Sequence, residues 1–154
     1  MDELEGQVTI NGEDIWTEYG AFLAEEKRGG MDNLKAIMAA SAGKSHVGVD
    51  IRERDGVKYS AKLDTRNKER DVTLHFAIIA DNAKAWMTRY RAFLGLLKKG
   101  EDGWLEITFE AIGVTLRVFY VSSTEFTPLA NLWYNGMKQA SRFKVTFREP
   151  EPVF

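Results

Sequence analysis

The residues of this chain that could support acid–base or metal chemistry are two histidines and a few neighbouring carboxylates. His46 and His75 both lie in segments of alternating apolar and polar residues, and neither belongs to an HExxH or HxxxH spacing. Metal sites and proton shuttles need partners at fixed spacing, so each histidine is interpreted as a strand residue that faces solvent or a neighbour. The sequence therefore predicts no metal site and no cofactor.

The serines and adjacent acids form no catalytic pattern. The chain has no Gly-x-Ser-x-Gly motif, and "GKS" at 43–45 lacks the earlier glycine of a phosphate-binding loop. Neighbouring acids such as Glu13 and Asp14 are adjacent rather than opposed, which is typical of a solvated face. We expect no catalytic residue, and a chain whose role is contact rather than catalysis.

Composition narrows the class of protein further. The chain has 154 residues, the length of one domain over 1–154, and no cysteine, which excludes disulfides and thiolate metal sites. Its formal net charge of −2 argues against a protein that mainly grips nucleic-acid phosphates. No segment approaches the roughly 20 apolar residues of a membrane span, and no secretion signal is visible. We expect a soluble protein made in the cytoplasm.

Two further groups of residues could bind a ligand. Basic residues cluster at 52–70, "RERDGVKYSAKLDTRNKER", but acids interleave with them almost one for one, so the local charge largely cancels. Trp86, Trp104 and Trp133 could line a ligand cavity, although the core of a β protein is the more usual place for such large apolar side chains. Neither group predicts DNA binding or a defined ligand site.

Hydrophobic periodicity predicts the elements that position these residues. Asn11-Gly12 and Asp55-Gly56 are typical hairpin turns, and "MDNLKAIMAASAGK" predicts a short helix with Asp32 as its N-cap and Gly43 past its end. Alternation predicts strands at 7–10, in the run "YGAFLA", in both arms of a hairpin at 45–63, and at 70–80, 104–111, 114–121 and 141–150.

One long helix is expected at about 82–99, capped by Asp81 or Asn82 and ended by Gly100. Its apolar residues form one stripe, consisting of Ala83, Trp86, Met87, Tyr90, Phe93, Leu94 and Leu97. The summed pattern predicts a mainly β (α+β) fold, either an antiparallel β-sandwich or a partly open barrel. Such a fold would have about seven strands, with the helix packed on them.

The strand at 70–80 is apolar on both faces. Val72, Leu74, Phe76 and Ile78 point one way, and Thr73, His75, Ala77 and Ile79 point the other. Such a strand lies between two layers or meets a partner. The charged hairpin loop at 52–70 is long enough to reach a neighbouring subunit.

Four stretches in order resemble bacteriophage tail proteins of the distal-tail and tail-tube type. They are "INGEDIWTEYGAFL" at 10–23, "GKSHVGVDIRERDGVKY" at 43–59, "RDVTLHFAIIADNAKAWMTRYRAFLGLLKKG" at 70–100 and "FKVTFREPEP" at 143–152. The resemblance implies a β-sandwich or half-barrel that associates into a hexameric ring in the tail of a phage or prophage virion. It also implies other phage tail proteins as partners, and DNA as a non-specific passing cargo of the channel, with no membrane involved.

Larger distal tail proteins carry a second, C-terminal domain, which favours a tube-like or single-domain subunit here. We expect the contacts between subunits to use Val47, Val49, Ile51, Arg54, Tyr59, Lys62, Arg66, His75, Ala77 and Ile79. The alternatives are a small-molecule-binding barrel of the lipocalin type, a related contractile or secretion tube subunit, and an enzyme of unrecognised type.

Overall fold

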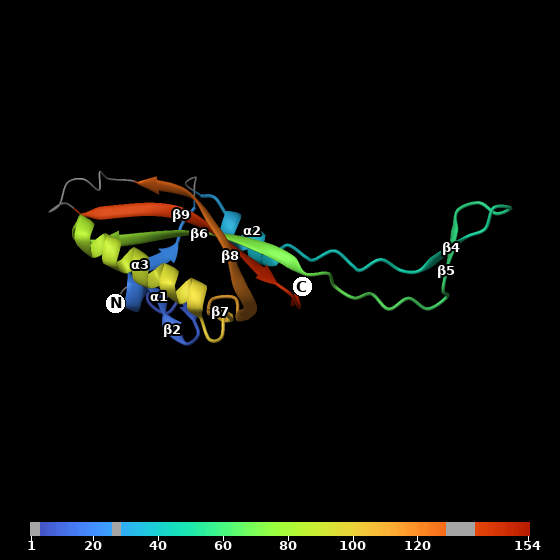
Figure 1. The fold of residues 1–154 in the computed structure, drawn as a ribbon, viewed down its shortest axis with the longest axis horizontal. Coiled ribbons are helices and arrows are strands. Elements are labelled where there is room, and N and C mark those ends of the chain that lie inside the picture. The colour runs from blue at the N-terminus through green and yellow to red at the C-terminus, as the bar shows by residue number, and fades with distance from the viewer. Residues whose placement is uncertain (1–3, 26–28, 129–137) are drawn as a thin grey trace.

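The structure is a computed structural model that describes residues 4–25, 29–128 and 138–154 (Figure 1). Seven strands form one antiparallel sheet in the order β2 (Glu13–Asp14), β1 (Val8–Ile10), β7 (Leu105–Phe109), β8 (Val114–Pro128), β9 (Gln139–Glu149), β6 (Arg70–Ala80) and β3 (Ala21–Leu23). A separate ribbon pairs β4 (Gly48–Asp50) with β5 (Val57–Tyr59), and the helices are α1 (Ile15–Tyr19), α2 (Asp32–Met38) and α3 (Ala83–Lys99). The mainly β fold with one long helix is confirmed.

The sheet curls until its two edges approach each other. The edge strands β2 and β3 are joined only by α1, which has five residues, and by Gly20. In a flat seven-stranded sheet the edges would be about 29 Å apart, whereas a five-residue helix spans about 7.5 Å. Of the two predicted arrangements, this corresponds to the partly open barrel, with α1 across its opening.

Strand β8 carries the bend between the two halves of the sheet. Its residues 114–118 pair with β7, and the register from Phe119 onward is with β9. Register shifts between Tyr120 and Ser122, and between Thr124 and Thr127, mark bulges, which bend a strand and increase its twist. The sequence pattern ended this strand at 121 because the bulges interrupt the alternation on which the prediction depended.

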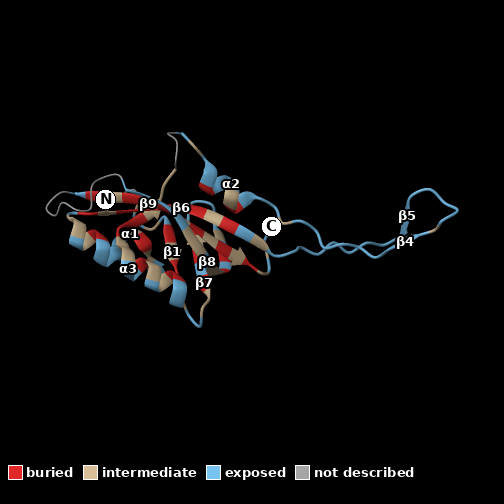
Figure 2. Cartoon of the chain, turned by 45° about the horizontal axis from the view of Figure 1, so that its top comes forward, coloured by how far each residue is buried: buried red, intermediate tan, exposed pale blue. Residues whose placement is uncertain are grey.

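Buried residues from both halves of the sheet form one hydrophobic cluster. Figure 2 shows their positions along the strands in red. The ring of Phe76 lies 5.2 Å from that of Phe93, 6.2 Å from that of Phe143 and 6.3 Å from that of Phe147, measured between centroids. One buried cluster includes Val8, Ile10, Val72, Leu74, Phe76, Ile78, Leu105, Ile107, Leu116, Val118, Phe143, Val145 and Phe147. The interior is a packed core.

Helix α3 closes one side of this core, as the sequence predicted. Asn82 caps it by accepting the N–H of Ala85 at 2.8 Å, and the buried Trp86 donates from Nε1 to the carbonyl of Ile78 at 2.9 Å. Placing Met87 in the buried stripe was wrong, since its side chain is 40% exposed. It lies about 100° around the helix from Trp86 and so reaches the solvent-facing side.

Helix α2 covers the part of β6 that β3 leaves unpaired. The side chain of the buried Asn33 accepts the N–H of His75 at 2.7 Å and donates to the carbonyl of Ala24 at 2.8 Å, continuing the ladder. Asp32 is not the N-cap. The carboxylate of Glu25 accepts the N–H groups of Asp32 (2.9 Å) and Asn33 (3.3 Å), and the helix ends at Met38, well before Gly43.

We expect Trp86→Ala to lower the free energy of unfolding by about 3–5 kcal/mol, because it empties a fully buried indole site and removes a partner of the Ile78 carbonyl. Urea unfolding followed by circular dichroism measures this. Met87→Ala on the exposed side of the same helix is the control, with an expected change within about 0.5 kcal/mol. Equal costs for the two variants would contradict the orientation of α3.

The hydroxyl of Tyr19 in α1 donates to Oε2 of Glu13 at 2.9 Å. Burial, and then this hydrogen bond, raise the pKa of Tyr19 from 10.0 to about 12. Because the folded chain holds this proton more tightly, the stability that it contributes is present below pH 10 and is lost between pH 10 and about 12. Phenolate absorbance should show a component near 12 that Tyr19→Phe removes; its persistence would contradict the assignment.

Candidate interaction site

A long arm, residues 42–69, extends from the compact body of the molecule. It joins α2 to β6 and carries the β4–β5 ribbon. The arm projects far from the rest of the molecule (Figures 1 and 2). Every residue of the arm is exposed except Ile51, which is half-buried. The arm contributes almost nothing to the core of its own chain.

Apolar side chains on the arm have no cover. Val47 is 89% exposed, Val49 57%, Tyr59 49%, and Val57 and Leu63 each 48%. An isolated two-stranded hairpin is marginally stable in water, and needs a further strand or a packed face for independent stability. Contiguous exposed apolar groups of this kind mark interaction surfaces. The arm is therefore a candidate contact surface for another protein.

The ribbon has two distinct faces. Gly48 pairs with Tyr59, and a Cβ at position 48 would lie 2.6 Å from Cγ1 of Val57 and 2.9 Å from Cε1 of Tyr59. The glycine therefore lets these two side chains close over the ribbon as one apolar face. Val49 pairs with Lys58, so the opposite face combines an apolar group and a positive charge.

A buried ion pair fixes the arm to the body. Arg70 donates from Nε to Oε1 of Glu149 at 2.6 Å, and their side chains are 8% and 0% exposed. The same guanidinium donates from Nη1 to the carbonyls of Ile37, at 2.9 Å, and Ala39. Since α2 ends at Met38, one side chain joins the point where the arm leaves α2 to the point where it returns into β6.

Residues 150–154 complete this base. The carbonyl of Phe154 accepts the N–H of Ser41 at 3.1 Å, and its ring lies 5.6 Å from the guanidinium carbon of Arg70. The N–H of Val153 donates to Oε2 of Glu149 at 3.4 Å. Both carboxylate oxygens of Glu149 therefore have partners, as a buried charge requires.

Two backbone hydrogen bonds continue the base into the arm. Lys68 donates from its N–H to the carbonyl of Ala42 at 2.8 Å, and Lys44 donates to the carbonyl of Arg66 at 2.7 Å. The two chains of the arm are thus tied together where they leave the body. The "GKS" stretch at 43–45 therefore has a structural role at the base of the arm.

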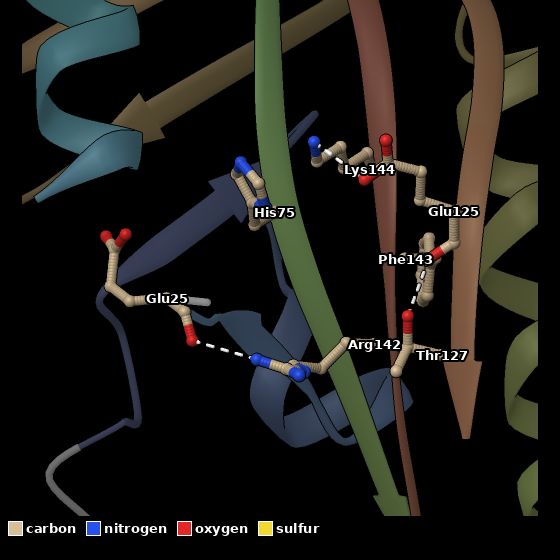
Figure 3. A pocket seen from close by; sticks show the side chains of 7 residues that line it. All are labelled: Glu25, His75, Glu125, Thr127, Arg142, Phe143 and Lys144. Atoms are coloured by element: carbon tan, nitrogen blue, oxygen red, sulfur yellow. Dashed lines mark hydrogen bonds and ion pairs between the residues drawn. The ribbon is translucent and has the colours of Figure 1, made fainter. Parts of the chain in front are cut away.

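The outer face of the body has a shallow pocket of about 350 Å³ over the middle of β6 and β9 (Figure 3). Arg142 donates from Nη1 to the carbonyl of Glu25 at 3.2 Å, and Lys144 pairs with Glu125 at 2.7 Å. The residues that line it are Glu25, His75, Glu125, Thr127, Arg142, Phe143 and Lys144. Charges of both signs meet here, so the pocket offers no field of one sign for a phosphate.

The ten predicted contact residues fall into two groups that the structure does not bring together. Seven lie on the arm: Val47, Val49, Ile51, Arg54, Tyr59, Lys62 and Arg66. The others lie on the outer face of β6, where His75 and Ile79 are half-buried and Ala77 is 3% exposed in the isolated chain. The role of all ten in contacts between subunits stays a prediction.

The residues considered for chemistry have structural roles. Asp14 caps α1 by accepting the N–H of Trp16 at 3.2 Å, and His75 lies in β6 as expected. His46 is not in a strand, because β4 begins only at Gly48.

The tryptophans lie in different surroundings. Trp86 is in the core, but the expectation was wrong for Trp104, which lies half-buried at the surface. There it packs 5.7 Å from Phe119 and lies 4.5 Å beneath Arg117. Trp133 lies outside the described residues.

Within residues 4–25, 29–128 and 138–154, no group of three or more His, Asp or Glu side chains is placed to hold a metal ion. In the same ranges no helix is long and apolar enough to cross a membrane.

The structure defines a class of fold: a curled antiparallel sheet with a flanking helix and a projecting two-stranded arm. No protein-family model and no curated protein matches the chain. Among solved structures it is similar to the Dit protein (gp 19.1) of SPP1, with a TM-score of 0.56 and 16% identity. The match covers 95% of this chain and 50% of that one, so the chain spans half the length of the matched protein. That structure is described as a paradigm of the hub adsorption apparatus in phages that infect Gram-positive bacteria.

We expect Arg70→Ala to lower the free energy of unfolding by about 3–5 kcal/mol, because it leaves the Glu149 carboxylate buried without its countercharge. Asp71→Ala is the matched control, since it breaks the neighbouring pair Asp71–Arg148 (2.8 Å), whose side chains are 48% and 37% exposed. That change should have little measurable effect in urea unfolding. A stable Arg70→Ala variant would show that the ion pair does not hold the base.

Proposed function

We propose that this protein is a structural subunit of a bacteriophage tail, of the distal-tail or tail-tube type. In this proposal copies of the chain assemble into a hexameric ring around a channel for DNA. The observation that carries it is the arm: a two-stranded ribbon held away from the body with its apolar side chains uncovered. The fold similarity to SPP1 Dit supports a phage tail role, since it extends over 95% of this chain.

Self-assembly is the best use for such an arm. Burial of apolar area stabilises association. Because the arm buries almost no apolar area in its own chain, it gains this stabilisation only by contact with another surface. An arm of one subunit that docks on the next is a head-to-tail contact, and contacts of this kind close into rings when the rotation permits. Other tail proteins would be the further partners of such a ring.

The body favours contact over ligand binding. A lipocalin-like barrel requires an open apolar cup, but here aromatic rings from α3, β6 and β9 meet across the interior. We propose likewise that the chain is not an enzyme, because its candidate acids form caps and ion pairs in the described parts of the fold.

DNA would pass through the ring as a cargo that is not gripped. On the outer face of the body, Lys144 pairs with the carboxylate of Glu125 and Arg148 with that of Asp71, while Arg142 donates to the backbone carbonyl of Glu25. Binding to phosphates depends on cations that are available to replace counterions. Paired charges of both signs support passage without strong attachment.

Shortening the arm tests the proposal. Replacing residues 47–63 by Asn-Gly keeps the hydrogen bonds at the base, so folding should persist, with a change in the free energy of unfolding within about 1 kcal/mol. In sedimentation, the full chain should form hexamers as its concentration rises, whereas the shortened chain should stay monomeric.

A pair of point variants removes the effect of changing the chain length. Val49→Asp on the arm should weaken assembly, whereas Met87→Asp on α3, at a similarly exposed apolar position, should not. A full-length chain that stays monomeric at every concentration would contradict the proposal. Loss of folding in the shortened chain would show that the arm is needed for the stability of the body, which would contradict its role as a contact surface only.

A further inference from the structure

Helix α2 carries a second apolar surface without cover. Met31 just before the helix is 56% exposed, Leu34 is 41% exposed and Met38 is 47% exposed. Their spacing of three and then four residues places them on one side of the helix, centred roughly 110° around it from the buried Asn33 and Ile37. We name Met31, Leu34 and Met38 the α2 stripe. A short helix with an exposed apolar stripe beside its buried residues has a second surface to contact.

The arm of the same chain leads away from this stripe. The arm begins four residues after Met38, and Figures 1 and 2 both show it running outward from α2, with the β4–β5 ribbon at its far end. The buried Arg70–Glu149 pair fixes that direction at the base. One chain therefore presents two exposed apolar surfaces that do not meet within it.

The arm and the rest of the chain carry net charges of opposite sign, which favours contact between the arm of one copy and the body of another. Residues 44–69 contain seven of the 21 Lys and Arg residues but only five of the 23 Asp and Glu residues. The rest of the chain therefore contains 14 basic and 18 acidic residues. The arm is thus net positive and the remainder net negative. Opposite net charges steer the arm of one copy towards the body of another and disfavour contacts between two arms.

The end of the arm has a hollow that could receive side chains of another protein. This hollow of about 220 Å³ is lined by the apolar Val49, Ile51 and Val57 together with Arg54, Asp55, Gly56 and Lys58. Pockets for small ligands usually occupy roughly 300–1,000 Å³, so this hollow is smaller than a ligand site. Leucine and methionine side chains, which the α2 stripe provides, suit such a hollow because they are apolar and, in the case of methionine, flexible.

We propose that the arm of one copy docks on the α2 stripe of a second copy through the hollow at its end, where Val49 and Ile51 share one face of the ribbon. This inference rests on the proposed self-assembly and adds the acceptor surface to it. The contact is head-to-tail, so every copy uses both surfaces once in a closed ring.

Disulfide trapping tests the pairing cleanly, because the chain has no cysteine of its own. Val49→Cys and Leu34→Cys are made in separate chains, mixed at a concentration where the unmodified protein is oligomeric by sedimentation, and oxidised. Met87→Cys, at an apolar α3 position that is 40% exposed, replaces Leu34→Cys in the control mixture. We expect the Val49–Leu34 dimer to form at least on the order of tenfold faster than the Val49–Met87 dimer, because docking raises the local thiol concentration.

The outcomes separate this inference from the proposed function. Oligomers in which Val49→Cys couples no faster to Leu34→Cys than to Met87→Cys would overturn the α2 stripe as the acceptor and leave self-assembly intact. The absence of oligomers at every concentration would overturn both.

A charge variant gives an independent measurement. Met38→Lys should raise the protein concentration needed for assembly by on the order of tenfold, and Met87→Lys should not, while both keep the circular dichroism of the folded chain. Unchanged assembly of a folded Met38→Lys variant would overturn the inference.

Discussion

The arrangement of this molecule depends on a buried charge pair, Arg70 with Glu149. Moving two charges out of water is costly, and the cost is offset only when good geometry and further hydrogen bonds satisfy both groups. Here the carbonyls of Ile37 and Ala39 serve Nη1 of Arg70 and the N–H of Val153 serves Glu149, while the buried Nη2 of Arg70 has no hydrogen-bond partner among the described residues. The requirement to satisfy one guanidinium therefore draws together the end of α2, the start of β6, the end of β9 and residues 150–154. The arm has a defined direction because it leaves and returns at this point.

The curled sheet imposes a second constraint, which explains why so short a helix as α1 matters. The chain passes from one edge of the sheet to the other through Ile15–Tyr19 and Gly20 alone, so the edges stay near each other only while that passage is packed. Gly20, with φ of 63°, is where the chain turns out of α1 into β3, and a Cβ there would lie 2.8 Å from the carbonyl oxygen of Ile79. The barrel therefore closes through local geometry, and its interior is left for the aromatic core.

The sequence predicts a structural feature when the residues that determine that feature lie close together along the chain. The long helix and the alternating strands depend on neighbours three, four or two positions away, and periodicity finds these. The contact that positions the arm joins residues 79 apart, and the cap of α2 comes from Glu25, seven and eight residues away from the N–H groups that it accepts. Neither leaves a local pattern. The arm residues were found because a charged hairpin is visible in sequence, but the buried pair that holds it was not.

The hydrogen-bonded base and the uncovered ribbon have opposite energetic consequences, and together they would favour the proposed assembly. The exposed Val47, Val49 and Tyr59 leave the isolated chain with apolar area in water, which is a cost that only association removes. Association itself costs conformational entropy for every segment that must be ordered. The ion pair and the two backbone hydrogen bonds already order the base of the arm in the isolated chain. Less conformational entropy would therefore be lost on association. In the proposed assembly, a flexible arm with the same residues would bind more weakly, so the buried pair would contribute to assembly although it lies far from the ribbon.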